Sequence, residues 1–258
     1  IMYKFFIFLF NILLIFLLFN NLYSISDDNL NSGKISIKPF CLSSLEYYTN
    51  KPQLETEYLR RLEYCINTSK DISPEGFKVN PIISDFRSQF GVNGRTRMTL
   101  HQGVDIIGRA NQSIIAIADG VVLETVVKDC IGPTLVINHG KSFDKKDLIT
   151  IYSHTGEFLV KEGDNVKRGS IIAKLPKKIE YPCMARVRHL HLQIGQQYCE
   201  KHEKGTWGCD YFIKDLYNSL NPHMYWANGP NNIACFEKNK KYPKGTITYP
   251  FECKKITN

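Results

Sequence analysis

The amino-acid sequence predicts a mainly β protein built on an antiparallel sheet or sandwich, with a short helical region near its N-terminus. From about residue 77, short runs rich in apolar and β-branched residues are separated by turn residues such as Gly and Asp. Two segments of this region, His101–Asp105 and His189–His191, gather imidazoles and a carboxylate. We therefore expect a sheet that carries a metal site.

Six apolar runs of the region are expected to be strands, because turn residues bound each of them. They are Ser113–Ala118, Val121–Val127, Thr134–Asn138, Leu148–Ser153, Ser170–Leu175 and Leu190–Ile194.

The period changes to helical spacing in residues 53–68, which follow Pro52, a residue suited to a helix start. The apolar positions of this segment are Leu54, Tyr58, Leu62 and Cys65. We expect an amphipathic helix that packs on the main domain.

The N-terminus has the layout of an export signal. Lys4 precedes an apolar run over residues 5–19, which is followed by polar residues. The run is shorter than the ~20 residues that span a bilayer comfortably. We expect residues 1–24 to be a signal peptide or, alternatively, an N-terminal membrane anchor, and the rest of the chain to be exported to the periplasm, cell envelope or medium.

Three further segments complete the expected organisation. Residues 25–76 are a linker with the accessory helix, residues 77–225 the β-core domain, and residues 226–258 a loop-rich extension tied by disulfides. Residues 25–76 are also candidates for a prosegment that blocks the site, in which case trimming them raises activity.

Composition and charge narrow the partners. The 258 residues carry a formal net charge of +8, which favours anionic partners by long-range attraction. No run of Arg and Lys with interleaved aromatic residues indicates a nucleic-acid groove, so no nucleic-acid partner is expected. The oligomeric state has no signal in the sequence.

The eight cysteines are an even number in a chain that we expect to be exported, so disulfides are the default. No CxxC pair occurs that would indicate a cysteine zinc site. The sequence cannot fix the connectivity; pairing by proximity suggests Cys41–Cys65, Cys130–Cys183, Cys199–Cys209 and Cys235–Cys253.

The two polar segments have the spacing of a metal site on neighbouring strands. In an extended strand side chains alternate, so His189 and His191 share a face. His101 and Asp105 are four residues apart, which places both on one face of a strand, with Gly103 adding no bulk between them. Imidazoles with a carboxylate are the ligands that zinc prefers where one position stays open for water.

Several further motifs occur with these segments in a fixed order. They are Phe90-Gly91…Arg95, Ala118-Asp-Gly120, His139-Gly140, Tyr152-x-His154 and Gly163-Asp-x-Val166-x-x-Gly169. With the two histidine motifs they resemble the lysostaphin-type (LytM-like) zinc endopeptidases over residues 80–195.

The resemblance implies a duplicated-hybrid-motif-like β-core and cleavage of stem or bridge peptides in peptidoglycan. It implies one zinc ion per chain, held by His101, Asp105 and His191, with His154 and His189 as catalytic histidines. In the expected mechanism, zinc-bound water attacks the peptide carbonyl. His189 is assigned as general base and His154 as the group that stabilises the transition state or orients the water; the two roles could be exchanged.

Three other histidines and two arginines lie outside the expected site. His139 is expected at a turn or strand end, and His202 and His223 at the surface. Arg186 and Arg188, just before the second histidine motif, are hypothesised to pair with carboxylates of the substrate, with a solvated basic loop as the alternative.

Two other functional classes are alternatives to a peptidase. A catalytically silent cell-wall-binding or hydrolase-regulating module on the same fold typically lacks a ligand, whereas all ligands are present here. A biotinyl or lipoyl carrier, suggested by the Gly163–Gly169 stretch, needs a modifiable lysine in its recognition motif, and none occurs.

Overall fold

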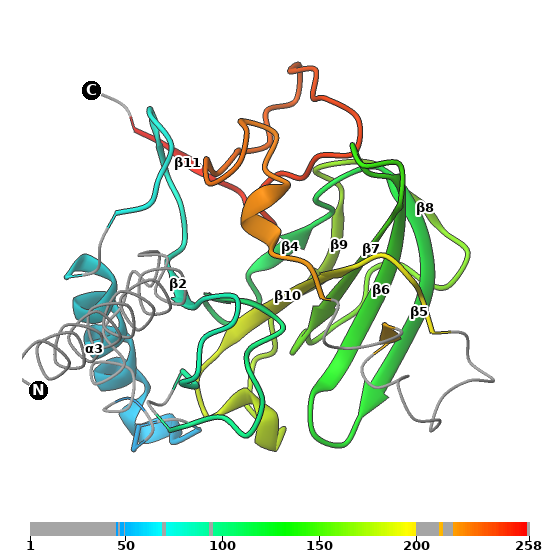
Figure 1. The fold of residues 1–258 in the computed structure, drawn as a ribbon. Helices are drawn as coiled ribbons and strands as arrows, with labels where there is room; N and C mark the ends of the chain where they lie inside the picture. The colour runs from blue at the N-terminus through cyan, green and yellow to red at the C-terminus, as the bar shows by residue number, and fades with distance from the viewer. Residues whose placement is uncertain are drawn as a thin grey trace, which may run out of the picture. The chain divides into compact units, whose positions relative to one another are not determined.

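A computed structural model describes residues 45, 47–48, 50–68, 71–92, 95–199, 212–213 and 219–256 (Figure 1). The expected signal segment, Cys41, His202 and Cys209 lie outside these residues. Residues 35–258 belong to one compact unit of the chain. Among the described residues, no helix has both the length and the apolar character needed to cross a membrane.

The mainly β fold class is confirmed. The helical elements are η1 (Pro52–Leu54), α3 (Glu55–Asn67), η2 (Pro182–Met184) and η6 (Pro222–Met224). The strands are β1 (Phe77–Lys78), β2 (Ile82–Ser84), β3 (Gly103–Ile107), β4 (Ser113–Ile115), β5 (Gly120–Lys128), β6 (Gly132–Lys141), β7 (Asp147–Ser153), β8 (Asn165–Val166), β9 (Ile171–Lys174), β10 (His189–Gly195) and β11 (Lys254–Lys255).

The central sheet is antiparallel and has seven strands in the order β2-β3-β10-β7-β6-β5-β8. Two-stranded sheets, β1-β11 and β4-β9, accompany it. Each of the six strands expected from the sequence overlaps an observed strand. In Figure 1, β10 lies between the long strands β5–β7 on one side and the strands β2 and β3 on the other.

The two faces of the central sheet have different tasks. On β10, Leu190, Leu192 and Ile194 point into the main hydrophobic core, where Ile172 of β9 also packs. The alternate residues of β10 begin with His189 and face the other side. At β10 the sheet thus packs apolar side chains on one face and carries His189 and His191 on the other.

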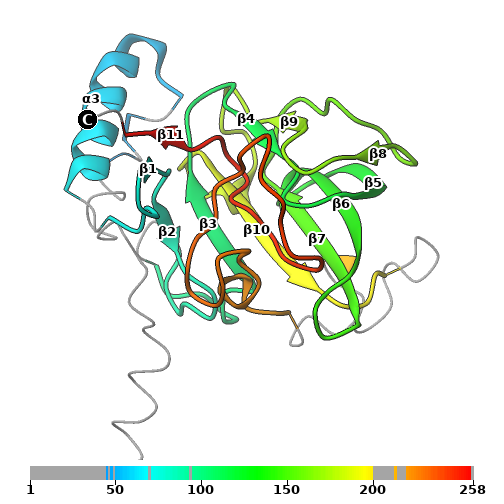
Figure 2. The same ribbon diagram turned by 90° about the horizontal axis from the view of Figure 1, so that it is seen from above.

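The C-terminal tail covers the face of the sheet that carries the main core. Trp226, Ile247, Tyr249 and Phe251 are almost completely buried in the main core, and Figure 2 shows the tail crossing above β3 and β10. The tail is tied by Cys235–Cys253, as expected. The domain boundaries themselves stay predictions.

Helix α3 confirms the expected amphipathic helix. Its buried residues are Tyr58, Leu62 and Cys65, and they form a second cluster with residues that include Ile83 and Ile107. Both views place α3 beside β2, at the edge of the sheet (Figures 1 and 2). The helix therefore completes a hydrophobic cluster, and its buried face is occupied by packing rather than turned toward the histidines.

The disulfide Cys130–Cys183 is confirmed together with Cys235–Cys253. The partners expected for Cys65 and Cys199 are the undescribed Cys41 and Cys209, so those two pairs stay predictions.

Candidate metal centre

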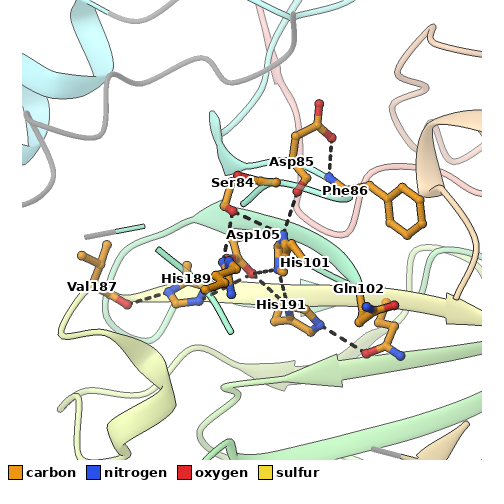
Figure 3. A network of polar contacts seen from close by, with 12 residues as sticks. Ser84, Asp85, Phe86, His101, Gln102, Asp105, Val187, His189 and His191 are labelled. Atoms are coloured by element: carbon orange, nitrogen blue, oxygen red, sulfur yellow. Dashed lines mark hydrogen bonds and ion pairs between the residues drawn. The ribbon is translucent and has the colours of Figure 1, made fainter. Parts of the chain in front are cut away.

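Three side chains converge on the polar face of the sheet, where β3 pairs with β10. Asp105 lies directly opposite His191 in the antiparallel register. Asp105 Oδ1 is 2.9 Å from His191 Nδ1 and 3.1 Å from His101 Nε2, and the two imidazole nitrogens are 3.0 Å apart (Figure 3). The structure thus brings together all three ligands that the sequence predicted.

One detail of that prediction is wrong. His101 does not lie in the strand with Asp105, because β3 begins only at Gly103. The loop over residues 85–88 holds His101 instead: Arg87 N donates to His101 O at 2.7 Å, and His101 N donates to Ser88 O at 3.1 Å.

The outer ring nitrogens of both histidine ligands are engaged, which determines the atoms left for a metal. His101 Nδ1 donates to the main-chain oxygen of Asp85 at 2.8 Å. His191 Nε2 lies 3.4 Å from Gln193 Oε1, a long contact in the direction of an acceptor. His101 Nε2 and His191 Nδ1 therefore present their lone pairs to the same point as the Asp105 carboxylate.

This donor set fits zinc. Two nitrogens and one oxygen at mutual distances of 2.9–3.1 Å approach the ~3.3 Å edges of a tetrahedron with zinc-to-ligand distances near 2.0 Å. His101 and Asp105 are buried, whereas His191 keeps 16% of its side chain exposed. The open side of the set consequently lies at His191.

The protonation states also suit a metal. Burial lowers the pKa of His101, which keeps its imidazole neutral. Burial opposes ionisation of Asp105, but the polar groups around it outweigh burial and hold the pKa of this carboxyl well below its usual range. Neutral imidazoles and an ionised carboxylate are the forms that bind a cation.

Two further imidazoles, the predicted catalytic pair, adjoin the donor set. The rings of His154 and His189 are 4.7 Å apart between centroids, and His154 is 6.0 Å from His191. His189 Nε2 is 3.7 Å from Asp105 Oδ1. All five predicted site residues therefore lie in one cluster.

Each of these two rings has one nitrogen fixed by a backbone carbonyl. His189 Nδ1 donates to Val187 O at 2.7 Å, and His154 Nδ1 donates to Ile131 O at 2.8 Å. The Nε2 atoms consequently carry lone pairs. Burial lowers the pKa of His189 and lowers that of His154 well below the usual value, so both rings are neutral at pH 7.

His154 adopts an unusual backbone conformation. Its φ of 64° lies in the left-handed region, which non-glycine residues rarely occupy. The conformation follows directly after the last residue of β7, and Thr155 N donates to Pro133 O at 3.0 Å just beyond it. This bend directs the imidazole toward the ligands, and such strain is often found at functional sites.

The sequence reasoning missed Arg97. One of its guanidinium nitrogens donates to Asp105 Oδ2 at 3.1 Å and to Ser84 Oγ at 3.1 Å. Oδ1 of Asp105 thus faces the imidazoles, while Oδ2 is bound by the Arg97 guanidinium. The only sequence signal was an arginine in the loop before His101, which has no specific spacing.

His223 is not at the surface, so that prediction is wrong. It is 1% exposed, its Nε2 donates to Asp85 Oδ1 at 2.8 Å, and its Nδ1 accepts from Trp226 Nε1 at 3.1 Å. Because Asp85 O holds His101, residue 223 is linked to a ligand through one residue. Sequence offered no signal for a contact across 138 positions.

The hypothesis that Arg188 binds substrate is also wrong. The side chain is buried, and it donates to the main-chain oxygens of Pro176 and Lys177 at 2.8 and 2.7 Å. Arg186 is exposed, and its role stays a prediction.

His139 lies near the end of β6, as expected, with Nδ1 3.0 Å from Asp119 O.

A protein-family model matches part of the chain. The family model described as peptidase family M23 matches residues 99–203, which include all five site residues, and confirms the resemblance noted in the sequence. Similar solved structures include a zinc containing peptidase from Vibrio cholerae, at 26% identity and TM-score 0.36 over 48% of this chain and 36% of that one. This chain thus spans about a third of the length of that protein.

Two catalytic domains are also similar. That of the antimicrobial peptidase lysostaphin from Staphylococcus simulans has 18% identity and TM-score 0.36, over 58% of this chain and 96% of that one. A catalytic-domain mutant of the prophage-encoded M23 protein EnpA from Enterococcus faecalis has 20% identity and TM-score 0.36, over 48% and 84%.

Proposed function

We propose that the peptidase family M23 domain of this chain is a zinc endopeptidase that hydrolyses peptide cross-links of peptidoglycan. The observation that carries the proposal is the convergence of the His101, Asp105 and His191 donor atoms beside two further neutral imidazoles. A silent module of the same fold has no need of this complete set.

These three residues would hold the metal in the protonation states described above. Zinc in such a site supplies a lowered pKa of water and polarisation of a peptide carbonyl. Arg97 holds the second oxygen of Asp105, which leaves a single carboxylate oxygen for the site. The remaining work is proton transfer, and it falls to the chain's own imidazoles.

His189 is proposed as the general base. Its Nδ1 is occupied by Val187 O, so Nε2 is the atom free to accept a proton from the attacking water. The same atom can then return the proton to the departing amine. Its position 3.7 Å from Asp105 Oδ1 places this exchange next to the ligands.

His154 is proposed to orient the water. With its Nδ1 proton donated to Ile131 O, its Nε2 accepts a hydrogen bond rather than donating one. This tautomer favours the second of the two roles expected from the sequence, holding the water in line, over donation to the oxyanion from a neutral ring.

The substrate assignment rests on the family and not on the metal site, since the site determines the reaction and not the polymer. A net charge of +8 suits an anionic wall polymer. Export of the chain is part of the proposal, and the two described disulfides support it because such bonds persist in oxidising compartments.

The proposal is tested with the oxidised chain on purified peptidoglycan, by mass spectrometry of the released fragments. Removing metal with a chelator should abolish release, and zinc but not magnesium should restore it. An unrelated protein such as casein serves as the control substrate. Full zinc occupancy without release of fragments would contradict the proposal and favour the silent module.

A further inference from the structure

The two carbonyls that orient the catalytic imidazoles belong to two loops joined by a disulfide. Ile131 O, which accepts from His154, directly follows Cys130. Val187 O, which accepts from His189, lies four residues beyond Cys183. The Cys130–Cys183 bridge therefore connects the supports of both rings.

The loops are joined by more than the sulfur atoms. Cys183 N donates to Cys130 O at 3.0 Å. The ring of Tyr181 lies against Gly132, where a Cβ would be only 2.5 Å from Tyr181 Cδ2. A side chain at residue 132 would push the loops apart, so glycine permits this close approach.

The path from Cys183 to Val187 is short and tightly turned. Val187 N donates to Met184 O at 3.0 Å. Ala185 and Arg186, between them, have φ values of 49° and 58°, an uncommon conformation for non-glycine residues. Movement of Cys183 would therefore be transmitted to Val187 O instead of being absorbed by a flexible segment.

The metal ligands depend on other parts of the chain. His101 is held by Asp85 O, and the outer nitrogen of His191 faces Gln193 Oε1. Neither residue belongs to the loops that the bridge joins. Loss of the bridge should consequently disturb the catalytic pair and leave the donor set in place.

We propose that the Cys130–Cys183 disulfide is a positioning device for catalysis, which holds the rings of His154 and His189 and does not contribute to metal binding. The inference rests on the proposed function of these two histidines. It also assigns a task to the cysteine-bearing loop before the second histidine motif.

The test compares a Cys130→Ala/Cys183→Ala double variant with a Cys235→Ala/Cys253→Ala control, which removes the other described bridge. The first variant should bind zinc like the wild type but lose at least about tenfold in kcat, with KM less affected, because the imidazoles are misplaced. The control should keep kcat at a temperature where it is folded.

A second readout needs no turnover. The Nδ1 protons of His154 and His189 are buried in hydrogen bonds and should give slowly exchanging proton signals in NMR spectra of the wild type and the control. These signals should broaden or vanish in the first variant. Unchanged signals together with unchanged kcat would overturn the inference.

The inference can also be tested on the wild type, without the double variant. Cys130 and Cys183 are exposed, whereas Cys235 is 2% exposed. A phosphine reductant should therefore open Cys130–Cys183 before Cys235–Cys253 under native conditions. Thiol labelling identifies the opened bridge, and the same two readouts apply. A wild type that binds zinc but cuts nothing would defeat the proposed function, while the NMR comparison still tests the positioning.

Discussion

Replacing Gly103 by alanine should separate the two strands that carry the metal ligands. A Cβ at this position would lie 2.4 Å from Leu192 O and 2.9 Å from Leu192 C, both main-chain atoms of β10. Backbone cannot swing aside as a side chain can. The strands must move apart by about 1 Å to reach ordinary contact distance.

The displacement falls beside the donor set, because Asp105 is two residues from Gly103 and His191 adjoins Leu192. Zinc sites tolerate changes of about 0.2 Å in their distances. We expect the Kd for zinc to rise by about 10–100-fold, the range seen when the support of a ligand is lost. Overpacking should cost about 1–3 kcal/mol of unfolding free energy.

The assay is a competition titration with a chromophoric zinc chelator, with urea unfolding of the metal-free protein alongside. Gly195→Ala is the matched control: it lies at the far end of β10, and its Cβ would meet the side chain of Ile213 at 2.1 Å. The control should lose stability and keep zinc. Wild-type zinc affinity and stability in Gly103→Ala would refute the reasoning.

Three further predictions follow from the packing and the charges. Leu62 is buried on α3, and Leu62→Ala should lower the unfolding free energy in urea by about 2–5 kcal/mol. Leu59 of the same helix is 44% exposed, and Leu59→Ala should change the unfolding free energy by less than about 0.5 kcal/mol. Equal effects of the two substitutions would contradict the packing of the helix. His223→Leu should weaken zinc binding by about tenfold in the chelator titration, and His223→Gln, which retains a donor, by less; equal affinities would show that the residue does not support His101. Burial lowers the pKa of His154 and His189 from the ordinary value of 6.5. Below pH 6.5 the unfolded chain therefore binds more protons than the folded protein, so the metal-free protein should be most stable above pH 6.5 and lose stability as the pH falls further. A pH-independent urea midpoint would contradict this.

The sequence was sufficient for features with a local pattern. Alternation along β10 placed His189 and His191 on one face, and apolar runs bounded by turn residues located the long strands of the sheet. Helical spacing located α3. Strands of two residues, such as β8 and β11, are too short to show a period, and the sequence did not predict them.

The errors concern residues whose environment depends on distant contacts. Even spacing placed His101 in a strand, but hydrogen bonds to residues 87 and 88 hold it in a loop. His223 and Arg188 have polar side chains, which usually lie at the surface. In the structure, Asp85 accepts a hydrogen bond from His223, and two main-chain carbonyls accept hydrogen bonds from Arg188, so both buried side chains have partners.

The central claim is most directly tested by measuring zinc content and peptidoglycan turnover together in the wild type, His191→Ala and His189→Ala. The wild type should carry about one zinc per chain and release fragments. His191→Ala should lose both metal and activity, whereas His189→Ala should keep the metal and lose turnover. A wild type without zinc, or a His191→Ala variant that still binds zinc and cuts peptidoglycan, would contradict the account.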